Sequence, residues 1–129
     1  MIDFSEIIFV LNWVVIAAWA NAVMDTLAHH YSESMFRSWN RNFWHPDVSA
    51  NNKYKDKIKE RGPAFFGSTT FLVMLTDGWH LMQFVFHSSW QAAIAVAMVD
   101  GWMILTYWVG IKIIFSGLFE LNYGYILKK

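Results

Sequence analysis

An uncharged apolar run near the N-terminus constrains the fold of this chain more than any other feature. No charged residue lies between Ile7 and Met24, and apolar sequence continues past Asp25 to about Tyr31. A helix needs about 20 largely apolar residues to cross a bilayer, and a run of about 18 without charges marks a candidate. The flank before the run is acidic and shows no signal-type cleavage site. We therefore predict a retained transmembrane helix over about residues 5–31.

The composition of the whole chain points the same way. Hydrophobic residues make up 56% of the 129 residues and charged residues 16%, with 8 Trp and 11 Phe. A soluble domain carries about 25% charged residues, so much of this apolar surface must face lipid or partner chains. The zero net charge argues against a nucleic-acid-binding surface. Because the chain has no cysteine, disulfides and thiolate metal sites are excluded.

Two further apolar runs predict two more spans. We expect one helix over about residues 64–87 and another over about 90–119, joined by a tight turn at 87–90. Each run crosses a ~30 Å hydrocarbon core at ~1.5 Å rise per residue. Helices satisfy their own backbone hydrogen bonds, so they are the expected spanning structure. The sequence thus predicts an all-α bundle of three transmembrane helices forming a single membrane domain, residues 1–129.

The segment of residues 32–63, between the first two predicted spans, is basic and aromatic. Rings next to cations are typical of a segment that lies at the level of the lipid headgroups. We therefore expect an interfacial amphipathic stretch here. The rings expected at the headgroup level are those of Trp39, Phe43 and Trp44, beside Arg37 and Arg41.

The distribution of Lys and Arg predicts the topology. Most of these residues fall in the loop of residues 32–63, and the chain ends in Lys128 and Lys129. Cytoplasmic loops carry an excess of such residues. We therefore expect a multi-pass protein of the cytoplasmic (inner) membrane, with its N-terminus outside and its C-terminus in the cytoplasm.

Ionisable residues inside the predicted helices are the candidate functional residues, because charges within a bilayer are costly. Asp25 and His29 are four residues apart, and Asp77 and His80 are three apart, so each pair shares a helix face. At ~1.5 Å per residue, Asp77 and Asp100 lie roughly 20 and 18 Å deep. Both are followed by Gly-Trp, which favours close packing of their helices. We predict that these five residues form one buried polar cluster.

Three roles remain open for this cluster. It could be structural, with Asp77 bonded to His80, Thr76 or Trp102. It could hold a divalent metal ion on Asp25, His29, Asp77, His80 and Asp100, because imidazole and carboxylate suit zinc, iron or manganese. It could relay protons or cations, as chains of acids and histidines do in transporters.

Four segments carry a resemblance to known proteins: Phe43–Pro46, Asn52–Lys55, Gly67–Phe71 and Leu75–His80. They cover about the middle third of the chain. This part resembles small integral membrane proteins of unassigned function from bacteria and their phages. The resemblance implies a membrane location, and no catalytic residue is transferred from it.

These observations favour a small multi-pass membrane protein that works as a homo-oligomer in the bilayer. Its polar cluster would have a structural or assembly role, or handle an ion or metal. The alternative is a membrane-embedded, metal-dependent enzyme acting on a lipid-phase substrate, which would need an open position on its metal. The sequence does not decide whether the protein is an enzyme.

Overall fold

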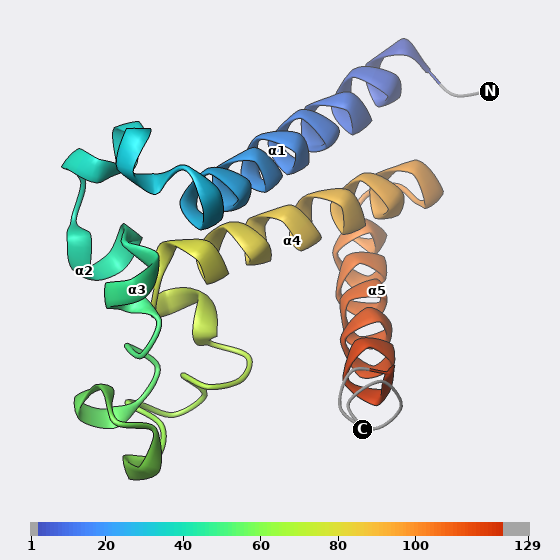
Figure 1. Cartoon of the computed structure of the whole chain (residues 1–129). Helices are drawn as coiled ribbons and strands as arrows, with labels where there is room; N and C mark the ends of the chain where they lie inside the picture. Colours follow the sequence, from blue (N-terminus) through green and yellow to red (C-terminus); the bar gives the residue numbers. More distant parts are fainter. Residues whose placement is uncertain (1–2, 123–129) are drawn as a thin grey trace. The chain divides into compact units, whose positions relative to one another are not determined.

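The computed structural model of the protein describes residues 3–122, and within them the regular structure is entirely helical (Figure 1). The all-α prediction is therefore confirmed for this part of the chain. The chain divides into two compact units, one of Met1–Ala17 with His87–Lys129 and the other of Ala18–Phe86. Lys128 and Lys129, on which the predicted topology partly depends, lie outside the described residues.

The first predicted helix is present as α1 (Phe4–His29). At its start the Glu6 carboxylate accepts the backbone N–H of Asp3 at 3.0 Å, which is one of the two bonds of a capping box, and the Asp3 carbonyl accepts the backbone N–H of Glu6. The helix leaves much apolar surface exposed, including Phe4, Val15 and Trp19. It is the one helix of the described chain that is long and apolar enough to cross a membrane, although a signal sequence meets the same criterion.

The second predicted span is wrong in its first half, because residues 64–77 form turns and a short 3₁₀ helix, η5 (Val73–Leu75). Gly67 explains the difference. Its φ of +80° is a left-handed conformation that a helix cannot contain, and its carbonyl accepts the Leu72 N–H across the turn. The neighbouring Ser68 hydroxyl donates to the Lys53 carbonyl at 2.7 Å, which ties this stretch to the preceding loop.

The predicted turn at 87–90 is also wrong, because α4 (Gly78–Met98) runs straight through it. The stretch contains neither glycine nor proline, so nothing in its backbone opposes a helix. The helix instead ends before Gly101, whose φ is +63°, and α5 (Met103–Glu120) follows. Asp100 therefore lies in the break and not in the middle of a helix. The apolar part of α5, Met103–Phe119, is shorter than a full span, so a three-span bundle is not shown.

The unit of residues 18–86 has a small core built around the end of α1. Ala20, Val23 and Leu27 of α1 pack with Phe36 and Met82. Short helices carry the aromatic segment over this core: η1 (Tyr31–Glu33), η2 (Met35–Ser38), α2 (Arg41–Trp44) and α3 (Pro46–Ser49). The loop that follows contains η3 (Lys55–Lys57) and η4 (Lys59–Arg61).

Part of the predicted interfacial segment turns inward in this unit. Trp44 stacks on Phe36 with ring centroids 5.3 Å apart and packs against the core. Trp39 touches both rings edge-on but keeps an exposed face. The segment therefore contributes to a folded core as well as to the surface.

In the other unit, the second half of α4 packs on α5 through polar contacts and rings. The Trp108 indole N–H donates to the Ser88 carbonyl at 3.2 Å, and the Phe115 ring lies 5.0 Å from that of His87. Beside these contacts is an apolar pocket of about 400 Å³, lined by residues that include Phe9, Trp13 and Trp108.

Candidate functional site

Asp77 forms the N-terminal cap of α4. Its carboxylate accepts the backbone N–H of His80 at 2.9 Å, and its own carbonyl accepts the N–H of Leu81 at 3.0 Å. Asp is among the residues preferred at this position, because the first N–H groups of a helix have no partner within it. The negative charge also suits the positive end of the helix dipole. The backbone thus places this carboxylate at the end of a helix.

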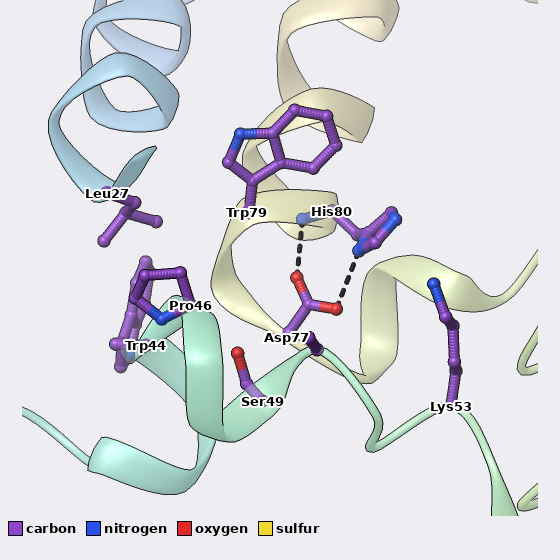
Figure 2. Close-up of a pocket in the computed structure, with 9 residues that line it drawn as sticks. Leu27, Trp44, Pro46, Ser49, Lys53, Asp77, Trp79 and His80 are labelled. Atoms are coloured by element: carbon purple, nitrogen blue, oxygen red, sulfur yellow. Dashed lines mark hydrogen bonds and ion pairs between the residues drawn. The ribbon is translucent and has the colours of Figure 1, made fainter. Parts of the chain in front are cut away.

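Asp77 and His80 also form a side-chain pair, with Asp77 Oδ2 2.7 Å from His80 Nδ1. A carboxylate only accepts hydrogen bonds, so Nδ1 must carry the proton and donate it. The Thr76 hydroxyl lies 3.1 Å from the same oxygen and shares its one proton between this oxygen and the Val73 carbonyl, 2.7 Å away. In Figure 2 the carboxylate points at the first turn of α4, where both dashed contacts end on His80. Asp77 is only 3% exposed, so its charge is stabilised almost entirely by these neighbours.

The pKa of Asp77 reflects this surrounding. Burial alone raises the pKa of the carboxyl, but the hydrogen bonds and charge of His80, together with the Thr76 hydroxyl, lower it below its ordinary value. Asp77 is therefore ionised at neutral pH. The pair stabilises the fold above the ordinary pKa of an aspartate, and this contribution is lost as the pH falls through the lowered pKa.

A pocket of about 180 Å³ opens beside the pair, entirely within the unit of residues 18–86. Its apolar walls include Leu27, Trp44 and Trp79, and Lys53 and the pair contribute the polar part. Figure 2 shows Leu27 descending from α1 and Trp79 rising from α4. A water occupies about 30 Å³ and drug-sized ligands need about 300 Å³ or more. The pocket therefore suits a few waters, a small ion or one inserted side chain.

Gly78 lets the aromatic wall approach the start of α4. A Cβ atom at this position would collide with the ring of Trp44, so only glycine permits the observed contact. The repeated Asp-Gly-Trp pattern predicts packing of two membrane helices at this glycine. Its observed role is to admit the Trp44 ring of the same unit.

Asn52 secures the residue that precedes the pair. Its side-chain amide donates to the Asn42 carbonyl at 2.6 Å and to the Thr76 carbonyl at 2.9 Å. These bonds connect α2, the loop and the start of α4. This role of Asn52 is not predicted from the sequence, because an Asn in a polar loop carries no pattern that shows which distant carbonyls it will contact.

The contacts that the structure gives for this pair do not include the other predicted site residues. Asp25 and His29 face each other at 3.9 Å, as their spacing predicts, but their side chains are 78% and 69% exposed. Asp100 is exposed and belongs to the other unit. Within residues 3–122, no three His, Asp or Glu side chains gather closely enough to hold a metal ion. The described residues thus form two Asp–His pairs, and the predicted metal cluster is not shown.

A second polar group, on α4 and α5, was not predicted as a site. The Lys112 ammonium donates to the Ser88 hydroxyl at 2.9 Å and to the Gln91 side-chain oxygen at 3.4 Å. Gln91 is fully buried, and its amide nitrogen has no hydrogen-bond partner. Sequence spacing gave no sign of this group, because its members come from two helices whose boundaries were predicted differently.

Comparison with known proteins does not assign the chain to a family. No protein-family model matches it, and no curated protein or solved structure shows significant similarity to it. The function is therefore inferred from the geometry of the Asp77–His80 pair and its pocket. The resemblance to small membrane proteins of bacteria and their phages stays a prediction.

Proposed function

We propose that this chain is a small membrane protein with a structural or assembly role, anchored by α1. The Asp77–His80 pair holds together a folded head, which we define as the unit of residues 18–86. The observation that carries the proposal is the buried Asp77 carboxylate, whose donors all come from Thr76 and His80. Its charge is used to cap a helix and fix a loop.

The exposed surface of α1 supports the membrane anchor. Only 22% of its most apolar window is buried within the chain, whereas the core helix of a soluble protein is mostly buried. Large apolar side chains along it need another apolar environment, and a bilayer supplies one. The proposed location is the bacterial inner membrane, with the basic segment of residues 32–63 in the cytoplasm.

Association of several copies completes this proposal. On α5, Ile113, Ile114 and Leu118 are exposed. Lipid or the same helix of another copy would cover them, and packing between membrane helices drives such association. A homo-oligomer would then present several heads on one side of the membrane.

A second candidate is an ion-handling or metal-dependent catalytic role for His80. A carboxylate that accepts the Nδ1 proton orients the imidazole and leaves Nε2 with its lone pair, as in many metal sites and general bases. His80 also lines the pocket. Since no third His, Asp or Glu among the described residues lies close enough to this pair to complete a metal site, a metal there would need ligands from another copy or from a substrate.

Purified protein in detergent distinguishes these roles. We would measure bound metal by elemental analysis and oligomer mass by light scattering for the wild type and for Asp77→Asn, with Asp25→Asn as the matched exposed control. The structural proposal predicts less than one metal ion per oligomer and a discrete mass above that of one chain. Stoichiometric metal that is lost in Asp77→Asn but kept in Asp25→Asn would favour the second candidate. A monomeric wild type would contradict the assembly role.

A further inference from the structure

The loop of residues 53–75 carries a row of cations in its first half and exposed apolar rings in its second half. Phe66 is 85% exposed, and Phe71 meets it edge-on at 5.7 Å while remaining exposed itself. Ile58, Phe65 and Leu75 are also exposed. Large apolar groups gathered on a surface mark a contact with a partner or a membrane. We call this segment the aromatic–basic loop.

The charge of the loop is strongly biased. Its Lys and Arg residues are Lys53, Lys55, Lys57, Lys59 and Arg61, against the two carboxylates of Asp56 and Glu60. Asp56 is engaged by Arg61 at 2.6 Å, so it neutralises a cation within the loop itself. Lys55 and Lys59 are exposed. The loop therefore displays positive charge to whatever meets its rings.

Hydrogen bonds hold the loop in shape. The Lys55 N–H donates to the Gly62 carbonyl, and the Ala64 N–H donates to the Lys53 carbonyl. These two bonds join the ends of the stretch of residues 53–64 that carries the cations. The bond from Ser68 to the Lys53 carbonyl then fixes the aromatic part to the same base. Rings and cations are consequently displayed together by a fixed backbone, and little ordering is needed when the loop binds.

We propose that the aromatic–basic loop docks on the surface of an anionic bilayer, with its rings among the headgroups and its lysines next to lipid phosphates. This inference rests on the proposed membrane setting of the chain. Aromatic rings settle at the headgroup level, and basic segments are attracted to anionic leaflets. The loop also shares its compact unit with residues 18–29 of α1, so the proposed anchor keeps it close to a membrane.

A lipid surface fits these side chains better than a nucleic acid does. The exposed apolar group mixes rings with the aliphatic Ile58 and Leu75, which cannot stack on bases as rings do. Aliphatic and aromatic groups together beside lysines are what an interfacial segment presents to a bilayer. Residues 53–63 belong to the segment that the sequence predicts to be interfacial, whereas residues 64–75 were placed inside a spanning helix, so the rings of this surface were not predicted.

Single-cysteine labelling tests the docking in the full chain, which has no native cysteine. Phe66→Cys carries an environment-sensitive fluorophore on the loop, and Asn51→Cys carries it on an exposed polar position outside the loop. Val15→Cys reports on α1. Each protein is reconstituted into vesicles of phosphatidylcholine alone or mixed with phosphatidylglycerol. We expect blue-shifted emission at position 66 only with the anionic lipid, no change at position 51, and blue-shifted emission at position 15 in both.

Charge removal sharpens the result. Lys55→Gln with Lys59→Gln, in the Phe66→Cys background, should reduce the ratio of docked to solvated loop on the order of tenfold, because each lysine near an anionic surface contributes separately. High salt should have the same effect. A water-like signal at position 66 in anionic vesicles, with position 15 still blue-shifted, would overturn the loop proposal and leave the anchor intact.

Other outcomes separate the remaining explanations. A water-like signal at position 15 would refute the anchor. In that case anionic vesicles would be added to the protein from outside. A blue shift at position 66 would support the loop proposal, and no shift would overturn it. Equal shifts in both lipids would overturn the charge-based docking. A shift that follows the protein-to-lipid ratio instead of lipid charge would mean that a second copy covers the loop, and would overturn the proposal too.

Discussion

Two Asp–His pairs of this chain differ in almost everything except their residue types. Asp77 and His80 are 2.7 Å apart in a nearly buried setting at the start of α4, whereas Asp25 and His29 lie 3.9 Å apart on an exposed face of α1. Helical spacing brings both pairs together. Only the first pair also satisfies backbone groups and lines a pocket. Spacing therefore predicts which side chains meet, while burial decides whether their meeting stabilises the protein.

Removing the buried carboxylate should produce the largest effect. Asp77→Ala loses the cap of α4 and leaves the His80 Nδ1–H without its acceptor, so we expect a loss of about 2 to 3 kcal/mol in the free energy of unfolding of the head. Urea unfolding in detergent, followed by tryptophan fluorescence, measures it. Asp77→Asn should lose only about half as much, since Asn also caps helices well. If Asp77→Ala were as stable as the wild type, the buried pair would contribute no more to the free energy of unfolding than the exposed pair does.

The α1 helix and the two Asp–His pairs could be predicted from the sequence, because each depends on residues close together in the chain. The boundaries of α4 could not. A run of apolar residues from Ala64 onward suggested a helix, but the left-handed Gly67 and the bond from Ser68 to Lys53 hold this stretch in turns. Those constraints depend on tertiary contacts that an apolar pattern does not contain.

The part of the candidate site that depends on residues close together in the chain was predictable, and the part that depends on distant residues was not. The pairing of Asp77 with both His80 and Thr76 was among the expected possibilities, and the structure contains both contacts. The pocket depends on Trp44 and Leu27, which come from distant segments. Asp100 was expected beside Asp77 because its helix was placed wrongly, and Gly101 moves it into a break.

Acid should remove the contribution of Asp77 to stability. Because the pKa of Asp77 is lowered in the folded protein, its contribution to stability is complete above the ordinary pKa of aspartate and disappears as the pH falls through the lowered pKa. The difference in unfolding free energy between wild type and Asp77→Asn should therefore shrink steadily as acid is added below about pH 4. Parallel urea titrations of the two proteins measure this difference. A difference that grew in acid would mean that the pKa of Asp77 is raised in the folded protein and not lowered.

The smallest effect is expected at the exposed pair. Asp25→Asn and His29→Gln remove an ion pair that water surrounds on both sides, and such pairs contribute little because solvent screens them and two long side chains must be ordered. Each substitution should change the free energy of unfolding by less than about 0.5 kcal/mol. The double variant should equal the sum of the single ones, since a weak interaction leaves little coupling energy. The same urea titrations, run at low and high salt, test this. A loss comparable to that of Asp77→Ala would show that the pair is covered in the working protein, by a second copy or by lipid headgroups, because an interaction of that size requires exclusion of water.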